Sequence, residues 1–198
     1  MFEGLVIPES HWPGVEPPSA FDTVKLKHLD TIPEGVRLRV DFNERLTPAA
    51  FLETASRLPR ERVDFIEDPV PYDAEVWRRI RAEGGCRLAL DRAQEDRMSH
   101  VGVDVLVHKP ALSDRFPSFD GEVVVTSYMD HPIGQFGAAW VAASNPVSAR
   151  CGLMTHVLFE PDAFIERITC DGAKLLPPGG TGVGFDDLLE ALPWTRLR

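Results

Sequence analysis

The chain has 198 residues, a length typical of one domain, and its hydrophobic share of 43% is enough for a sizeable core. The formal net charge of −10, with dispersed basic residues, argues against nucleic acid or an anionic membrane as a partner. No apolar run is long enough to span a membrane, and the start MFEGLVIPES lacks the basic region of a signal peptide. We therefore expect a cytoplasmic protein.

Eight short apolar runs recur along the chain and predict strands. Several are rich in Val, Ile and Leu, as strands buried on both faces of a parallel sheet are. The runs are GLVIP (from Gly4), DTVKLK (from Asp22), VRLRVDF (from Val36), VDFIED (from Val63), CRLALD (from Cys86), VDVLVHK (from Val103), EVVVTSY (from Glu122) and GLMTHVLF (from Gly152).

Helical patterns lie between some of these runs. In LTPAAFLETASRL, Thr47 suits an N-cap and Pro48 the first helical position. A second helix is predicted over residues 72–83, with Asp73 as its cap. Two more are predicted over residues 134–143 and 185–192.

Strands that alternate with helices predict a parallel sheet, and eight of them favour a closed (β/α)8 TIM-type barrel. Such barrels usually need about 250 residues. The connections from Lys27 to Arg37 and from Lys109 to Glu122 leave little room for a helix. The predicted fold is therefore an α/β barrel, shortened, with some crossover helices missing.

Three acidic residues stand where predicted strands end. Asp41 ends VRLRVD, Glu67 ends VDFIE and Asp91 ends CRLALD, each about one strand–helix unit after the last. The carboxyl ends of the strands form the active-site face of a barrel. Converging carboxylates repel one another, and a divalent cation relieves that repulsion; all-oxygen ligands suit Mg²⁺, with Mn²⁺ possible. The alternative for any one acid is that it simply opens a loop.

Lysines stand at two other strand ends. Lys25 and Lys27 lie two residues apart and share one face of their strand, and Lys109 approaches from across the barrel. A lysine near a metal suits a general base. The alternative is an exposed lysine at the end of a strand.

Polar residues after the seventh run are further candidates. Ser127 and Asp130 could bind a carboxylate or a hydroxyl group, and His131 could contact a substrate. Loop capping is the alternative for Ser127 and Asp130.

The order of these motifs resembles the enolase superfamily. VTSYMDHPIGQ, from Val125, is similar to the seventh-strand segment of the o-succinylbenzoate synthases within that superfamily, and the resemblance covers nearly the whole chain. The other matching motifs are KLK (Lys25, Lys27) for K-x-K, VDFN (Asp41, Asn43) for D-x-N, FIEDP (Glu67, Asp68) for E-[ED]-P, LALD (Asp91) for the fifth-strand acid and VHKP (Lys109) for the sixth-strand lysine.

The resemblance implies a Mg²⁺-dependent lyase of menaquinone biosynthesis. Such an enzyme removes the proton α to a carboxylate of a small molecule and then eliminates water. The implied metal ligands are Asp41, Glu67 and Asp91, and the implied catalytic residues are Lys27 and Lys109. The implied substrate-binding residues are Lys25, Asn43, Ser127, Asp130 and His131.

Two other functions stay open. The same two lysines could serve a racemase or cycloisomerase, and the chain could be a non-catalytic truncated barrel remnant. Members of the superfamily carry an N-terminal capping domain, whereas residues 1–198 are expected to form a single barrel domain without one. We therefore expect exposed apolar surface at the barrel mouth and at the gaps after Lys27 and Pro110. Such surface would favour self-association or a separate capping domain.

Overall fold

Six parallel strands form the central sheet of the computed structural model, which describes residues 1–92, 100–113, 115–147, 150–180 and 182–195. Their order in the sheet follows their order in the chain, as in the wall of a barrel. They are β1 (Thr23–Leu26), β2 (Arg37–Asp41), β3 (Val63–Glu67), β4 (Leu88–Leu90), β5 (Val105–His108) and β6 (Glu122–Val125).

Two short segments, the first and second closing segments, join the edges of this sheet. Residues 10–12 and 151–152 form isolated parallel bridges, which are Trp12 with Val24 of β1, Ser10 with Cys151, and Thr126 beyond β6 with Gly152. The segments are also bonded to each other, because the backbone N–H of His11 donates to Cys151 O at 2.9 Å. They take the places of the first and eighth strands, so the predicted barrel is present in a shortened form.

The first and last predicted strands lie elsewhere than expected. GLVIP does not pair, and Val6 is 75% exposed; Pro8 has no N–H to give to a ladder, so pairing begins only after it. In GLMTHVLF only Gly152 bridges, and Thr155–Leu158 forms the 3₁₀ helix η2.

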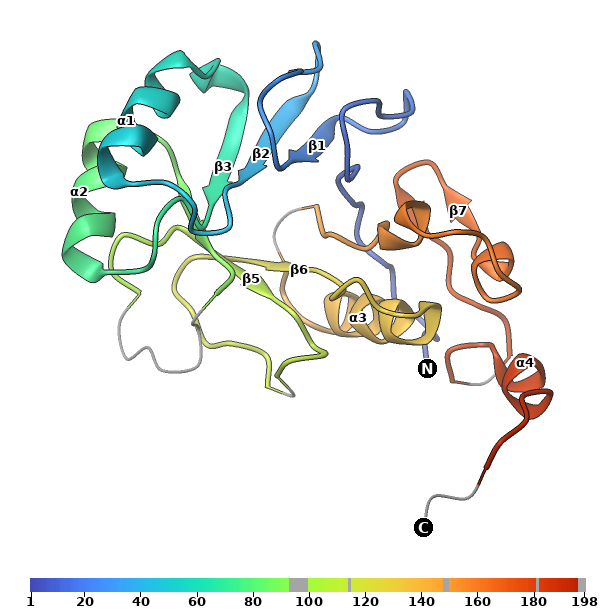
Figure 1. Cartoon of the computed structure of the whole chain (residues 1–198). Coiled ribbons are helices and arrows are strands. Elements are labelled where there is room, and N and C mark those ends of the chain that lie inside the picture. The colour runs from blue at the N-terminus through green and yellow to red at the C-terminus, as the bar shows by residue number, and fades with distance from the viewer. Residues whose placement is uncertain (93–99, 114, 148–149, 181, 196–198) are drawn as a thin grey trace.

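Four helices were predicted and all are present, as α1 (Pro48–Arg57), α2 (Ala74–Gly84), α3 (Pro132–Ser144) and α4 (Asp186–Glu190). The Thr47 hydroxyl accepts from Ala50 N, as an N-cap should, and Gly85 ends α2 with a φ of 63°. Figure 1 shows α1 and α2 side by side on the outside of the barrel, and α3 beside β6.

The smaller elements are η1 (Arg60–Arg62), η3 (Ile165–Arg167) and a hairpin of β7 (Cys170–Asp171) and β8 (Lys174–Leu175). No helix in the described part of the chain is long and apolar enough to cross a membrane.

The connections from β1 to β2 and from β5 to β6 contain no helix in their described residues, as predicted. The expectation of a bare gap after Lys27 is wrong, because Leu29 and Ile32 of that connection pack against the core themselves. After Pro110 the expectation holds at Leu112, which is 54% exposed.

Alternation along the strands separates two faces. Leu38, Ile66 and Leu88 belong to the cluster under α1 and α2, whereas Phe65, Ala89, Val105, Val107 and Val124 form a separate small cluster inside the barrel. Because the side-chain period of a strand is two, the inner series continues into Glu67, Asp91, Lys109 and Thr126. Strand periodicity thus directs these polar side chains towards the barrel axis.

Candidate active site

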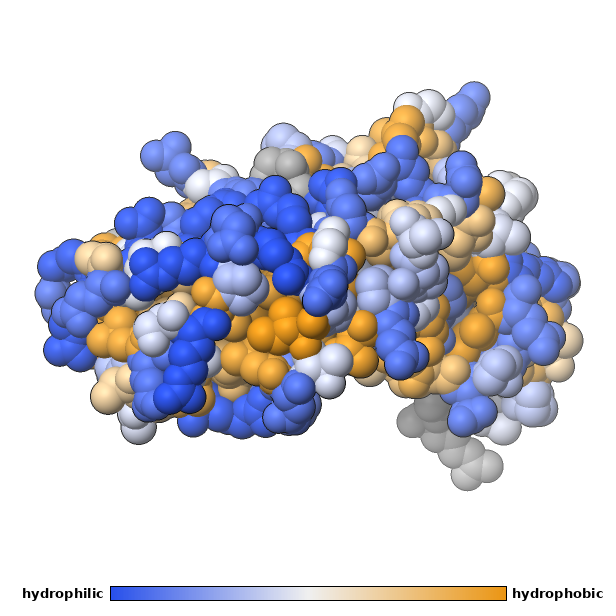
Figure 2. Space-filling model, turned by 90° about the horizontal axis from the view of Figure 1, so that it is seen from above, coloured by the Kyte–Doolittle hydropathy of each residue, from blue (hydrophilic) through white to orange (hydrophobic). Residues whose placement is uncertain are grey.

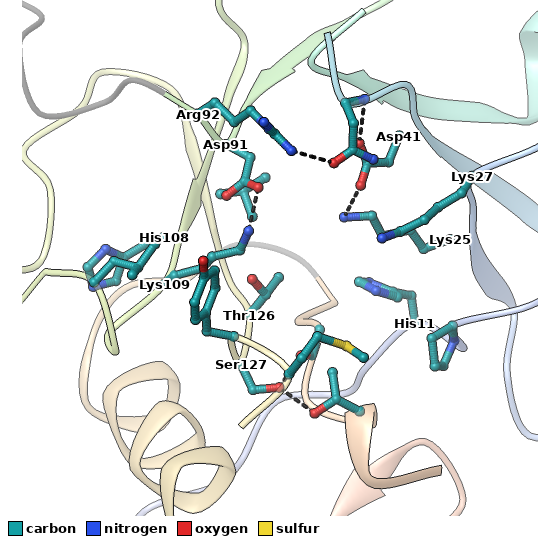
Figure 3. Close-up of a pocket in the computed structure, with 18 of the residues that line it drawn as sticks. His11, Lys25, Lys27, Asp41, Asp91, Arg92, His108, Lys109, Thr126 and Ser127 are labelled. Atoms are coloured by element: carbon teal, nitrogen blue, oxygen red, sulfur yellow. Dashed lines mark hydrogen bonds and ion pairs between the residues drawn. The ribbon is translucent and has the colours of Figure 1, made fainter. Parts of the chain in front are cut away.

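A cavity of about 1540 Å³ lies at the carboxyl ends of the strands (Figure 3). It is larger than the roughly 300–1,000 Å³ of a usual small-molecule site. Seven of the ten predicted site residues line it, namely Lys25, Lys27, Asp41, Asn43, Asp91, Lys109 and Ser127.

Exposed apolar side chains surround the mouth of this cavity. Val15, Leu112, Tyr128, Met129 and Leu158 all line it and are all exposed. Seen from above, apolar surface also crosses the middle of the molecule between hydrophilic flanks (Figure 2). The predicted apolar surface at the mouth is therefore present, while association with a partner stays a prediction.

Lys25 joins two of the predicted metal ligands. Its Nζ lies 3.1 Å from Asp41 Oδ2 and 2.7 Å from Glu67 Oε1. Burial alone would lower the pKa of Lys25, but the charges of Glu67 and Asp41 outweigh it and raise this pKa above its usual value. Lys25 is therefore a firmly held ammonium ion.

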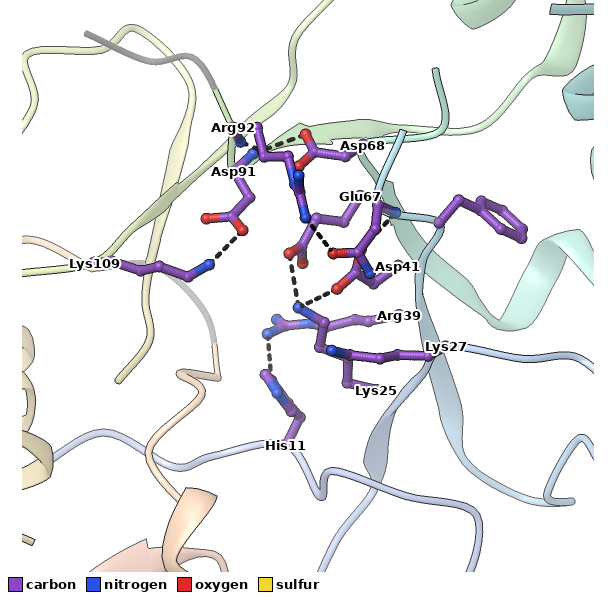
Figure 4. Close-up of polar contacts among 12 residues, drawn as sticks. His11, Lys25, Lys27, Arg39, Asp41, Glu67, Asp68, Asp91, Arg92 and Lys109 are labelled. Carbon is purple, nitrogen blue, oxygen red and sulfur yellow. Dashed lines mark hydrogen bonds and ion pairs between the residues drawn. The ribbon is translucent and has the colours of Figure 1, made fainter. Parts of the chain in front are cut away.

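Lys109 pairs with the third predicted ligand. Its Nζ makes an ion pair with Asp91 Oδ2 (Figure 4). The same Nζ lies 5.4 Å from the centre of the Tyr128 ring. Lys109 and Lys25 therefore reach the acids from different strands, β5 and β1. Lys27, one residue beyond β1, is exposed, lines the cavity and makes no ion pair with any described residue.

The three acids influence one another. Asp41 and Glu67 stand opposite each other in the β2–β3 register. Burial raises the pKa of Glu67, the charges of Asp41 and Asp91 raise it further, and Lys25 opposes them. A set of carboxylate oxygens under mutual repulsion fits a hard divalent cation in its chemistry. However, within the described ranges no three His, Cys, Asp or Glu side chains are close enough together to hold a metal ion. The ligand set stays a prediction.

Asp68, next to Glu67, supports the end of β4. It has a φ of 42° and is 1% exposed, and its carboxylate accepts the backbone N–H of Asp91 at 3.0 Å and of Arg92 at 3.1 Å. Burial is the largest influence on this carboxyl group and raises its pKa to about 7, although the two N–H donors oppose the rise. Arg92 in turn donates to Asn43 Oδ1 at 3.0 Å. These contacts link the loops after β2, β3 and β4.

The polar residues after β6 make mostly local contacts. Ser127 lines the cavity and its hydroxyl lies 2.6 Å from Thr155 Oγ1. Asp130 and His131 are not among the lining residues: Asp130 accepts from Tyr128 N, and His131 Nδ1 accepts from Ile133 N at the start of α3. Their predicted role towards a substrate gains no support from these positions.

Among the lining residues that reasoning from sequence missed are Thr126 and His11. Thr126 continues the inward series of Val124, and this alternation could have singled it out ahead of Ser127. His11 lies in the first closing segment, whose pairing was assigned to the wrong residues, so no signal pointed to it.

Residues 22–102 match the family model described as "Enolase C-terminal domain-like". The chain is 34% identical over 182 residues to an o-succinylbenzoate synthase of Bdellovibrio bacteriovorus. That alignment covers 83% of this chain but 54% of the relative, so the chain spans about half of the relative's length.

Two solved structures share the fold at low sequence identity. A MenC structure from Desulfotalea psychrophila superimposes with a TM-score of 0.60 at 18% identity, covering 86% of this chain and 60% of that one. A dipeptide epimerase from Cytophaga hutchinsonii, complexed with Mg and the dipeptide D-Ala-L-Val, gives 0.65 at 16% identity, with coverage of 92% and 61%. The solved structures show the same fold, and the family model and the relative, together with the motifs, place the chain in the enolase superfamily as the C-terminal barrel part of its members.

Proposed function

We propose that residues 1–198 form the catalytic barrel of an o-succinylbenzoate synthase-like lyase. The observation that carries this proposal is one cavity in which Lys27 and Lys109 come from different strands beside Asp41 and Asp91. The relative from Bdellovibrio bacteriovorus supports the choice of reaction. The proposed substrate is 2-succinyl-6-hydroxy-2,4-cyclohexadiene-1-carboxylate, which is dehydrated to o-succinylbenzoate in menaquinone biosynthesis.

Lys25 of β1 and Lys27, one residue beyond this strand, take different roles in this mechanism. Lys25 is held as an ammonium ion by Asp41 and Glu67, so it supplies positive charge beside a bound carboxylate. Lys27 has no carboxylate within ion-pair distance among the described residues and faces the same cavity. We assign the removal of the proton α to the substrate carboxylate to Lys27.

Lys109 acts from the other side of the cavity. Its ammonium group stabilises the negative charge that develops on the substrate when the proton leaves. The hydroxyl group then leaves the adjacent ring carbon together with the proton that Lys27 removed. One water is released, and the aromatic ring remains. Asn43 and Ser127 line the same cavity and are proposed to contact the substrate.

Asp41, Glu67 and Asp91 are proposed to hold Mg²⁺, with Mn²⁺ as the alternative. When bound, the cation supplies Lewis-acid stabilisation of charge on the substrate carboxylate. The ammonium groups of Lys25 and Lys109 pair with these three acids and offset two of their three negative charges, which is the kind of electrostatic compensation that a divalent cation would supply.

The test is formation of o-succinylbenzoate from the cyclohexadiene substrate, followed by chromatography with and without Mg²⁺. We expect product only with the metal, and a fall of about 10²–10⁴-fold in kcat for Lys27→Met and for Lys109→Met. Lys174→Met is the matched control, because Lys174 lies in the β7–β8 hairpin outside the cavity. Absence of product from the wild type with Mg²⁺ would reject the proposal.

A racemase or epimerase is the second candidate. It is favoured by the placement of two lysines on different strands around one cavity, which allows a proton to leave one face of a carbon and return to the other. Incubation of L-Ala-L-Glu in D₂O separates the candidates, since an epimerase incorporates deuterium and inverts a centre whereas the lyase does neither. A non-catalytic barrel would change neither substrate.

A further inference from the structure

A buried arginine crosses the inside of the barrel to its closing segments. Arg39 of β2 is 1% exposed, and its Nε donates to Asp64 Oδ2 at 2.8 Å. Its Nη1 donates to Arg150 O at 2.5 Å and lies 3.1 Å from Nδ1 of His11. The guanidinium group of Arg39 therefore fixes the position of the His11 ring.

This contact determines where the His11 ring carries its proton. A guanidinium group only donates hydrogen bonds, so Nδ1 must accept, and the proton of the neutral ring must be on Nε2. Burial, followed by the charges of Arg39 and Lys25, lowers the pKa of His11 well below its usual value, in agreement with a neutral ring. No described residue bonds Nε2, and His11 lines the cavity (Figure 3).

A second polar group next to His11 also lacks a partner. Thr126 Oγ1 is buried, lines the cavity, and has no hydrogen-bond partner among the described residues. The two side chains converge over Gly152: a Cβ built there would lie 2.6 Å from Thr126 Cγ2 and 3.0 Å from His11 Cε1. A buried hydroxyl without a partner is unfavourable, so a bound group is expected to complete it.

We propose that His11 Nε2–H and Thr126 Oγ1–H together bind the second carboxylate of the substrate, the one distant from the reacting carbon. The inference rests on the proposed function and extends it by naming a subsite for the succinyl chain. Both groups can donate to an anionic oxygen, and the cations of Arg39 and Lys25 flank the ring.

The order of the barrel places this subsite away from the acids. Asp41, Glu67 and Asp91 end β2, β3 and β4, whereas Thr126 follows β6 and His11 lies in the segment between Cys151 and β1. The acids and the proposed subsite thus come from different strand ends of the one cavity, so we assign the ring carboxylate to the acids and the distant carboxylate to His11 and Thr126.

The test compares two ligands by isothermal titration calorimetry with Mg²⁺ present. One is o-succinylbenzoate, and the other is 2-butyrylbenzoate, which has a methyl group in place of the distant carboxylate. We expect Thr126→Val and His11→Leu to weaken the first by about tenfold or more and to leave the second unchanged. His11→Gln, whose amide can still donate at the position of Nε2, should recover part of the loss.

Ser10→Ala is the matched control. Ser10 Oγ is also buried without a partner in the described structure, and it neighbours His11, but Ser10 does not line the cavity. Circular dichroism establishes that each variant is folded. The ¹⁵N shifts of the His11 ring in the free wild type should identify Nε2 as the protonated nitrogen.

The possible outcomes are distinct. The subsite is overturned if the variants weaken the binding of both ligands equally, or of neither, or if the ring proton of His11 is on Nδ1. In each case the proposed function still stands. If the wild type binds no o-succinylbenzoate, the proposed function fails and the subsite falls with it.

Discussion

At the scale of single residues, carboxylates distinguish two lysines that look equivalent in the sequence. Lys25 and Lys27 both face the cavity, yet only Lys25 lies within ion-pair distance of Asp41 and Glu67. The register sets Asp41 opposite Glu67, and the ammonium group of Lys25, whose own backbone pairs with Arg39, reaches both carboxylates. Two positions along the chain at the end of β1 therefore separate a fixed positive charge, Lys25, from the proposed base, Lys27.

Asp68 provides the first prediction at this scale. Asp68→Ala removes the acceptor of the Asp91 and Arg92 N–H groups, so Asp91 should lose its position and the affinity for Mn²⁺ should fall by about tenfold. Electron paramagnetic resonance of free Mn²⁺ measures this affinity without turnover.

Asp73→Ala is the control for that experiment. Asp73 also accepts two backbone N–H groups, from Glu75 and Val76 at the start of α2, but it does not line the cavity. It should cost about 1 kcal/mol of stability and leave Mn²⁺ binding unchanged. Equal Mn²⁺ affinities in wild type and Asp68→Ala would contradict the positioning role.

At the scale of elements, one buried side chain attaches α3 to the end of the barrel. Gln135 is 0% exposed, and its Nε2 donates to Leu153 O at 2.7 Å and lies 2.8 Å from His156 Nδ1. Its Oε1 accepts from His156 N at 3.1 Å. The second closing segment pairs through single bridges, so this helix supplies bonds that a longer strand would make within the sheet.

We therefore predict that Gln135→Ala destabilises the chain by about 3 kcal/mol, because it leaves several buried polar groups without partners. Urea unfolding followed by fluorescence measures the change. Asn145→Ala, which removes one bond to Val141 O at the end of the same helix, should cost about 1 kcal/mol or less. A loss no larger for Gln135→Ala than for Asn145→Ala would show that α3 is held by apolar packing alone.

At the scale of the whole molecule, the barrel closes through a charged network in place of long strands. Arg39 contacts His11 in the first closing segment and Arg150, the residue directly before the second, and Asp64, which pairs with Arg39, also binds Arg37 at 2.9 Å. Breaking a buried pair of this kind by removing one partner is strongly destabilising. Closure of the barrel is therefore sensitive to the charge state of the groups around Arg39.

Three buried or half-buried histidines, of which His11 belongs to this network, predict a dependence of stability on pH. Burial lowers the pKa of His11, His108 and His156, so these rings stay neutral in the folded chain below the pH at which they are protonated in the unfolded chain, about 6.5. The unfolded state then binds more protons, and stability falls as the pH drops below about 6.5.

His11→Gln should reduce the slope of the unfolding free energy against pH by up to about 1.4 kcal/mol per pH unit. His28→Gln, at an exposed position, should leave this slope unchanged. Urea titrations between pH 7 and pH 5 measure both slopes. A slope for His11→Gln equal to that of the wild type would mean that His11 is protonated in the folded chain.

Local patterns were sufficient for much of the fold and of the candidate site. The strands from β1 to β6 follow from their apolar runs, and the ends of α1 and α2 follow from Thr47, Asp73 and Gly85, because capping and strand periodicity depend on neighbouring residues. The motif order placed Lys27 and Asp91 at strand ends around one cavity, where the structure also has them.

The sequence by itself thus determined the order of β1 to β6, the ends of α1 and α2 and the residue types at the strand ends. Only the tertiary structure decided how the barrel closes, which acids Lys25 and Lys109 pair with, and that His11 reaches the cavity. The physical reason is that these contacts join residues far apart in the sequence. Arg39 and Arg150, whose contact helps to close the barrel, are 111 positions apart, and single bridges between short segments leave no periodic pattern in a sequence.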